Sequence, residues 1–242
     1  MTGVAAPRRA ESWNGPVGAH RAAHRAGYDA RPAGVDDALF GAAAIVPGDR
    51  VLVVGCGAGA TTRFAARLAA PGHVVGVDAC APPLERARAG TAAEGIENVC
   101  YVCADAQAHS FPAGGYDVVV GRGGPMSLAG HAAALRDVAR ALRPGGRLAF
   151  VCPRPPGPHR EEPERVRETL AGFAEVRVVP VTMESSRGRD VPDAVELLLS
   201  PLPGGALPAS RLAGPEEVLL PFAAGRRART RTGLLLVTAV RP

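Results

Sequence analysis

Three closely spaced glycines are the residues of this chain best suited to hold a small ligand. They lie in the segment Gly55-Cys-Gly-Ala-Gly59, between a short apolar run, residues 51–54, and an alanine-rich stretch. Glycine lets the backbone turn sharply, and it lets a ligand approach without meeting a Cβ atom. A helix after this loop would point its first amides and the positive end of its dipole at the same place. This order predicts a cofactor site.

The glycine spacing alone fits two kinds of cofactor. Gly55, Gly57 and Ala60 satisfy the G-x-G-x-x-G/A pattern of dinucleotide sites. With Gly59 in place of Ala60, the same loop satisfies the pattern of S-adenosylmethionine sites. Asp78, at the end of the next predicted strand, serves both, because a carboxylate there can accept hydrogen bonds from both ribose hydroxyls.

The segment after the third predicted strand separates these two alternatives. Asp105 follows this strand directly, and Asp117 stands at the start of the fourth. A carboxylate at Asp105 is well placed to accept a hydrogen bond from an adenine amino group, while the amide of Ala106 can donate to a ring nitrogen. Dehydrogenases do not need an acid at this position. The pair Asp105-Ala106 therefore favours S-adenosylmethionine.

A regular alternation of elements must bring these residues together. The apolar runs predict strands at residues 51–54, 73–77, 99–103, 116–120 and 147–152. The stretches between them predict helices at residues 61–70, 82–94 and 127–142. This alternation is typical of an α/β fold with a doubly wound sheet.

The two flanks predict a cap and the rest of the sheet. Residues 1–48 are expected to form an N-terminal helical cap or lid, with helices near 17–27 and 35–45, ahead of a domain of residues 49–242. The C-terminal part predicts helices at 162–173 and 192–199 and strands at 175–182 and 230–239. Pro180 indicates that its strand lies at a sheet edge or carries a bulge.

The ordered motifs resemble those of class I S-adenosylmethionine-dependent methyltransferases. The resemblance is carried by residues 51–62, Val77-Asp78, residues 103–107 with Tyr116-Asp117, and residues 141–150. Ser12-Trp-Asn-Gly15 and the last strand resemble a bacterial branch that acts on small molecules. The resemblance implies a Rossmann-like, seven-stranded sheet with an antiparallel last strand. It also implies S-adenosylmethionine as cofactor and S-adenosylhomocysteine as product.

The same resemblance assigns residues along the cofactor. They are Gly55, Cys56, Gly57 and Gly59 at the methionine end, Asp78 and Ala79 at the ribose, Asp105 and Ala106 at the adenine, and Gly121 and Arg122 beside the methyl group and the acceptor. The family usually has an acid where this chain has Val53. One polar contact towards the methionine end is therefore expected to be missing.

Candidates for a direct part in the chemistry are fewer. Methyl transfer from a sulfonium is an in-line displacement, so alignment supplies much of the acceleration, and a base matters only if the acceptor must lose a proton. His20 and His24 are four residues apart on the first predicted helix and share one face. They are either bases in a segment that covers the active site or exposed histidines on a surface helix. Arg122 either binds an anionic acceptor or pairs with an acid of a neighbouring helix.

Composition narrows the partners and the compartment. The net charge is +5, but the last 21 residues, 222–242, hold five arginines and no acid, so the preceding chain is neutral. This distribution does not predict nucleic-acid binding. No apolar run approaches the roughly 20 residues that span a bilayer, and no secretory signal is evident, so a cytoplasmic protein is expected.

The five cysteines do not predict a metal site or a disulfide framework. Cys100 and Cys103 have the spacing of a metal or redox pair, but they lie on a predicted strand, where residues three apart point to opposite faces. No second pair completes four ligands. Both side chains are therefore expected to be buried thiols, and no metal is predicted.

Three functions are left to compare. The favoured one is methyl transfer to an O, N, S or C atom of a small molecule, as in natural-product pathways. The second is a cyclase-like or regulatory protein that keeps the cofactor site without methylation. Val53 motivates it, as does the short interval of residues 153–163, where this branch usually has a longer helical lid. A partner subunit in a homodimer is one way to close such an open pocket. The third function is a nicotinamide-dependent oxidoreductase.

Overall fold

The computed structural model describes residues 33–122, 132–153, 162–187, 223–224 and 227–242. The chain divides into two compact units, residues 33–183 with 232–242 and residues 1–32 with 184–231. The first unit contains all the helices of the described residues and most of the sheet. The expected division into a cap of residues 1–48 and one further domain stays a prediction.

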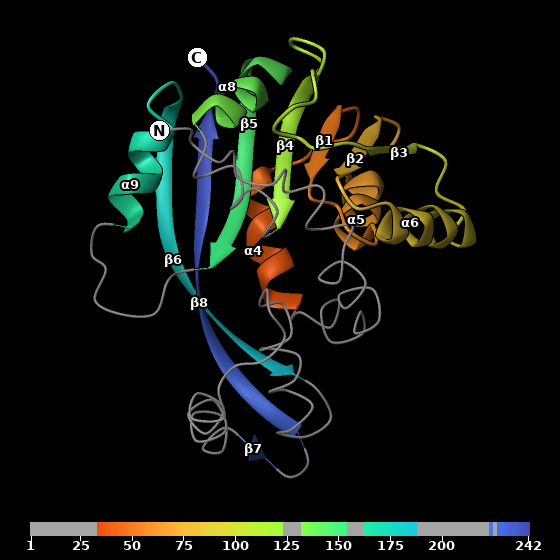
Figure 1. Ribbon diagram of the computed structural model, residues 1–242, viewed down its shortest axis with the longest axis vertical. Coiled ribbons are helices and arrows are strands. Elements are labelled where there is room, and N and C mark those ends of the chain that lie inside the picture. Colours follow the sequence, from red (N-terminus) through yellow and green to blue (C-terminus); the bar gives the residue numbers. More distant parts are fainter. Residues whose placement is uncertain (1–32, 123–131, 154–161, 188–222, 225–226) are drawn as a thin grey trace, which may run out of the picture. The chain divides into compact units, whose positions relative to one another are not determined.

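Seven strands of the described residues form the main sheet, in the order β3-β2-β1-β4-β5-β8-β6 (Figure 1). Their bounds are Val51–Val54 (β1), Val74–Asp78 (β2), Val99–Cys103 (β3), Tyr116–Arg122 (β4), Leu142–Pro153 (β5), Ala174–Arg187 (β6) and Arg227–Val240 (β8). The two-residue β7 (Ala223–Ala224) pairs with β8. Strands β1 to β5 are parallel, and β8 is antiparallel to β5. The predicted doubly wound sheet with its antiparallel last strand is confirmed.

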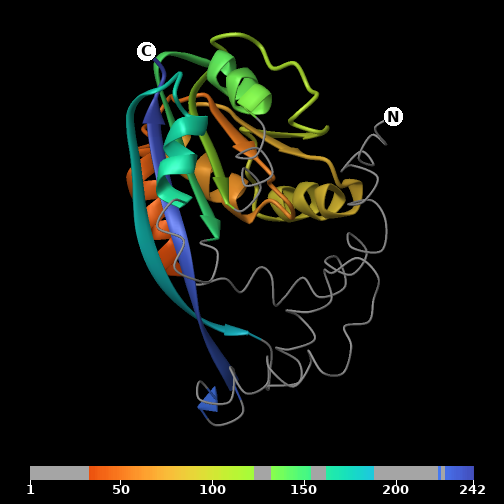
Figure 2. The same cartoon turned by 60° about the vertical axis from the view of Figure 1, so that its left-hand side comes forward.

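Helices cover both faces of this sheet (Figure 2). On one face lie α4 (Ala33–Ala43), α5 (Ala60–Ala69) and α6 (Ala81–Ala93), which share one buried apolar cluster. On the other face, α8 (Ala132–Ala141) and α9 (Glu162–Thr169) contribute to a second cluster. No helix of the described residues is long and apolar enough to cross a membrane.

The first strand shows why its sequence is apolar throughout. Leu52 and Val54 belong to the cluster with α8 and α9, while Val51 and Val53 belong to the cluster with α4 and α5. Each of the four side chains is at most 3% exposed. A central parallel strand buries both faces, so it cannot alternate apolar with polar residues.

The predicted elements differ from the structure mainly at their ends. Strand β4 runs two residues beyond its predicted end, so Gly121 and Arg122 lie within it. Strand β5 begins at Leu142, which pairs with Tyr116, and the pairing resumes only at Arg147. Residues 143–146 form the irregularity between these two points. The helices expected at 17–27 and 192–199 lie outside the described residues.

The expectation that Cys100 and Cys103 are buried is wrong. Both thiols are exposed, whereas Cys56, Cys80 and Cys152 are buried as free thiols. Among the described strands, β3 stands at an end of the sheet and pairs with β2 alone, so its side chains lack the cover that central strands receive. The strand order that places β3 at this edge is a tertiary property, and local sequence does not encode it.

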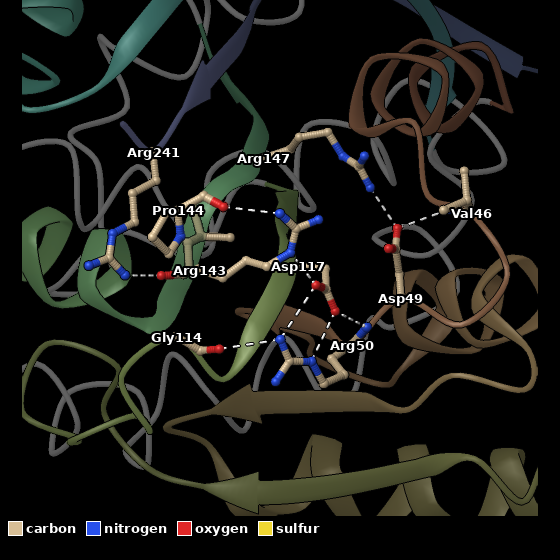
Figure 3. Close-up of polar contacts among 10 residues, drawn as sticks. Val46, Asp49, Arg50, Gly114, Asp117, Arg143, Pro144, Arg147 and Arg241 are labelled. Carbon is tan, nitrogen blue, oxygen red and sulfur yellow. Dashed lines mark hydrogen bonds and ion pairs between the residues drawn. The ribbon is translucent and has the colours of Figure 1, made fainter.

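A cluster of arginines and aspartates fixes the starts of the central strands (Figure 3). The Asp117 carboxylate, in β4, accepts hydrogen bonds from the backbone amide of Arg50 at 2.8 Å, from Arg50 Nε at 3.0 Å and from Arg143 Nε at 2.6 Å. Beside it, Asp49 accepts from Arg147 Nη2 at 2.6 Å. The cluster thus ties β1, β4 and β5 together before their parallel register begins.

Burial alone would raise the pKa of Asp117. The hydrogen bonds from Arg50 and Arg143 and the charge of Arg50 outweigh burial and hold the pKa well below its ordinary value. A carboxylate with a depressed pKa stabilises the folded chain above the unfolded pKa of about 4, and this contribution is lost as the pH falls through the folded pKa.

Replacing Asp117 with Asn is therefore expected to lower the free energy of unfolding by about 1–3 kcal/mol at pH 7, because charged hydrogen bonds to two arginines are lost. Urea denaturation at several pH values measures this, and the difference from the wild-type chain should narrow below about pH 4. The matched control is Asp137→Asn, whose side chain is 41% exposed and 3.4 Å from Arg140. It should cost under about 1 kcal/mol. An equal loss of unfolding free energy in the two variants would show that Asp117 contributes no more than an exposed carboxylate.

Candidate cofactor site

The carboxyl ends of four neighbouring strands bring the predicted cofactor residues to one edge of the sheet. Val54, the last residue of β1, lies beside Val77 of β2 and Gly121 of β4. Asp78, the last residue of β2, lies beside Cys103 of β3. The loops that follow these strands therefore start side by side, at the place where ligands bind in open α/β sheets.

The loop after β1 is built from left-handed backbone. Gly55, Gly57 and Gly59 have φ angles of +68°, +52° and +83°. No heavy atom lies within 4 Å of the place where a Cβ of Gly57 would stand. The space beside Gly57 is therefore open, so a ligand could approach the backbone at this residue.

Most amides of this loop are already bonded within the protein. Gly55 N and Cys56 N both donate to the carbonyl of Val77, at 2.9 and 3.1 Å, and Gly59 N donates to Cys56 O at 2.9 Å. The loop is consequently fixed to β2 before any ligand binds. The first amides of α5 have no partner within the helix, since an α-helix leaves its first turn unbonded, and they are the donors available to an anionic group.

Asp78 joins the loop after β1 to the loop after β2. Its Oδ2 accepts a hydrogen bond from Gly57 N at 2.8 Å, and its Oδ1 accepts from Cys80 N at 2.9 Å. Two carboxylate oxygens offer about four acceptor positions. The carboxylate can therefore hold both loops and still accept from a pair of ribose hydroxyls.

The loop after β3 is tied to the same place. Ala104 N donates to the carbonyl of Asp78 at 3.0 Å, and Asp105 Oδ1 accepts from Gln107 N at 2.9 Å. The carbonyl of Asp105 also accepts from the amides of Ala108 and His109, both at 2.9 Å. These bonds fold residues 105–109 into a tight turn. The turn holds Asp105 in the loop after β3, next to the loop that follows Asp78. This order suits a nucleoside whose ribose lies at Asp78 and whose adenine lies at Asp105.

Cys56 has a buried thiol whose Sγ lies 3.9 Å from the carbonyl oxygen of Gly57. Its side chain is 6% exposed. Burial, with the nearby charge of Asp78 as a smaller cause, raises the pKa of the thiol far above its ordinary value. The thiol stays protonated at neutral pH, which excludes it as a nucleophile.

Arg122 forms an ion pair that sequence reasoning left open. Its Nη1 lies 2.8 and 2.9 Å from the two carboxylate oxygens of Asp36, on α4, and the Arg122 side chain is 12% exposed. The pairing with an acid of a neighbouring helix is thus present. Nothing in the sequence near Asp36 distinguished this residue, because the two partners are far apart along the chain. His20 and His24 lie outside the described residues.

Together these features fit a nucleoside cofactor with an anionic tail. Gly57 has open space where a Cβ would stand, and Asp78 offers a carboxylate beside it. Helix α5 begins at Ala60, directly after its N-cap Gly59. Among the described residues, no group of three His, Cys, Asp or Glu side chains lies together as a metal site would. The sheet order and the site define a Rossmann-like, nucleotide-binding class of protein.

Comparison with known proteins gives the family. Residues 51–146 match the family model described as a methyltransferase domain. The chain is 32% identical over 163 residues to the demethylmenaquinone methyltransferase of Thermus thermophilus, covering 62% of this chain and 72% of the relative. The chain belongs to the class I S-adenosylmethionine-dependent methyltransferase family.

Two further relatives are methyltransferases of Streptomyces and Saccharothrix. The aklanonic acid methyltransferase of Streptomyces sp. (strain C5) is 37% identical over 109 residues, which are 45% of this chain and 50% of the relative. The nocamycin O-methyltransferase of Saccharothrix syringae is 41% identical over 117 residues, which are 48% of this chain and 41% of the relative. The chain therefore matches about half the length of these two relatives or less.

The solved structures agree with the fold. The YcgJ protein from Bacillus subtilis aligns with a TM-score of 0.63 over 85% of this chain and 97% of its own. At 19% identity, this likeness shows the fold alone.

Replacing Asp78 with Ala is expected to weaken binding of S-adenosylhomocysteine by about 10–100-fold, because a charged acceptor and the tie to Gly57 are both lost. Isothermal titration calorimetry measures the affinity, and circular dichroism checks that the fold is kept. The control is Asp37→Ala, since Asp37 is an exposed carboxylate on α4. Unchanged affinity in Asp78→Ala would refute the assignment of this residue to the ribose.

Proposed function

We propose that this protein transfers a methyl group from S-adenosylmethionine to a small-molecule acceptor of the natural-product type. The observation that carries the proposal is the pre-formed loop from Gly55 to Gly59. It is hydrogen-bonded to Val77 and Asp78 at the carboxyl ends of the parallel strands. The named relatives support the class of acceptor, because aklanonic acid, nocamycin and demethylmenaquinone are the molecules in their names.

The residues divide the work of holding the cofactor. Asp78 and Ala79 would hold the ribose, Asp105 and Ala106 would hold the adenine, and the backbone of Gly55, Cys56, Gly57 and Gly59 would contact the methionine end. The first turn of α5 favours an anionic group there, because its amides and its dipole point outward. When bound, S-adenosylmethionine supplies an electrophilic methyl group on a sulfonium. The chain contributes alignment, which is the main requirement of an in-line displacement.

Arg122 and Gly121 border the acceptor in this proposal. Nη1 of Arg122 donates to both carboxylate oxygens of Asp36, and this contact anchors the guanidinium at the end of β4. A guanidinium fixed in this way can bind an acidic or enolic acceptor through its remaining N–H groups. His20 and His24 stay the predicted bases for an acceptor that must lose a proton. A cytoplasmic location and a homodimer also stay predictions.

Turnover is the direct test of the proposed activity. The purified chain should convert S-adenosylmethionine to S-adenosylhomocysteine in the presence of a suitable member of a panel of phenols, aromatic carboxylic acids and quinones, with the methyl group found on the acceptor by mass spectrometry. In parallel, S-adenosylhomocysteine at 100 times its Kd should stabilise the chain by about 2.7 kcal/mol in thermal-shift titration. Stabilisation by NAD or NADP instead would refute the proposal. Tight cofactor binding with no methylation in any reaction would favour the non-methylating alternative.

The ion pair gives a matched test of Arg122. Arg122→Gln removes the guanidinium. Asp36→Asn removes the charge of its partner and keeps the guanidinium. If Arg122 binds an anionic acceptor, Arg122→Gln should raise the acceptor KM by about tenfold or more, and Asp36→Asn, which loosens the guanidinium but keeps its charge, should raise it by a clearly smaller factor. Steady-state kinetics on the acceptor found above measures both. Equal changes in the two variants would show that Arg122 serves only to hold α4.

A further inference from the structure

Tyr101, on β3, packs beneath the glycine loop. A Cβ placed on Gly59 would stand 2.5 Å from the Tyr101 hydroxyl oxygen and 3.1 Å from its Cζ atom. A Cβ placed on Gly76, in β2, would stand 2.8 Å from Cδ1 of the same ring. Real Cβ atoms essentially never come within 3.0 Å of another heavy atom, so the ring occupies space that exists only because both residues are glycine.

The hydroxyl of Tyr101 fixes the ring in this place. It lies 2.8 Å from the hydroxyl oxygen of Thr91, on α6, and Thr91 is 5% exposed. Burial raises the pKa of Tyr101, so the phenol stays protonated and able to donate. Ala87, on α6, closes the remaining side of Gly59, 2.8 Å from where a Cβ would stand. The last glycine of the loop is thus enclosed from within by β3 and α6.

Gly57 and Gly59 therefore have different reasons to be glycine. Both have left-handed backbone, with φ angles of +52° and +83°. The missing side chain of Gly57 would enter open space, while that of Gly59 would enter the Tyr101 ring. The first arrangement makes room for a ligand, and the second makes room for a residue of the protein itself.

We propose that Tyr101 is a positioning residue for the cofactor. Its ring determines the position of Gly59 and, through Gly59, the position of the first turn of α5. Gly59 is the N-cap of α5, and its carbonyl accepts the first helical hydrogen bond, from Arg63 N at 2.9 Å. A shift of the ring therefore moves the amides that face the methionine end. Small displacements of such donors are costly, since binding groups must be held within about half an ångström of their place. The inference rests on the proposed assignment of this loop to the cofactor.

A double-mutant cycle tests the contact. The variants are Gly59→Ala, Tyr101→Leu, which lacks the outer ring atoms, and their combination, with the Kd of S-adenosylhomocysteine measured by calorimetry. Gly59→Ala alone should weaken binding by about 10–100-fold, and in the Tyr101→Leu background its effect should be at least about threefold smaller. The rescue is partial, because an alanine at positive φ is strained in both backgrounds and the Cβ of Ala87 still stands 2.8 Å from the added methyl group. An equal effect of Gly59→Ala in both backgrounds would overturn the proposal.

The matched control repeats the cycle at Gly57. Gly57→Ala should weaken binding by the same factor with either residue at position 101, because Gly57 does not face Tyr101. If Tyr101→Leu rescued Gly57→Ala as well, the effect would be general loosening of the chain, and the positioning role would be wrong. If neither Gly57→Ala nor Asp78→Ala weakens binding, the cofactor assignment fails instead, and this outcome is separate from the cycle at Gly59.

A milder variant keeps the test valid if Tyr101→Leu does not fold. Tyr101→Phe removes only the hydroxyl, the atom nearest to Gly59, and keeps the rest of the ring. It should weaken binding of S-adenosylhomocysteine by about 2–5-fold, and it should still reduce the effect of Gly59→Ala. Thermal melting of each variant separates lost binding from lost folding. A Tyr101→Phe chain with wild-type affinity and an undiminished Gly59→Ala effect would overturn the proposal.

Discussion

The site depends on one short set of hydrogen bonds at the end of β2. The carbonyl of Val77 accepts from Gly55 N and Cys56 N, and the Asp78 carboxylate accepts from Gly57 N. These bonds turn the chain out of β1 and determine where α5 begins. Because these hydrogen bonds use the amides of the loop, the amides left to bind an anionic group are those of the first turn of α5. A loop that is already bonded loses little conformational entropy when a ligand binds.

The opposite edge of the sheet supplies the constraint that the site needs. Asp117 holds Arg50 at the start of β1 and Arg143 ahead of the regular part of β5, so the parallel strands start in a fixed register (Figure 3). A parallel register fixed at one end also determines which residues meet at the other. The neighbouring positions of Val54, Val77 and Gly121 follow from it. Charged bonds at the starts of the strands thus determine which residues meet at their carboxyl ends.

The sequence predicts this fold well where its signals are local. Apolar runs, glycine loops and prolines located β1 to β4, α5 and α6 nearly to the residue, because each element carries its own periodicity and end signals. The sequence did not predict the exposure of Cys100, and it named pairing with a helix acid as one alternative for Arg122 without identifying Asp36, since both depend on which elements lie side by side. The same holds for Tyr101. It reads as an ordinary strand residue until the fold places it against Gly59.

Val53 shows how such a departure from a motif is explained by packing. The family usually has an acid at this position, but here the side chain is 1% exposed and belongs to the same buried cluster as Leu39 of α4. An unpaired carboxylate in that cluster would be costly, because burial penalises the charged form. Asp36, at the start of α4, is an acid that Arg122 neutralises. Helix α4 thus meets the sheet through two kinds of contact, an apolar cluster that includes Val53 and an ion pair at the end of β4.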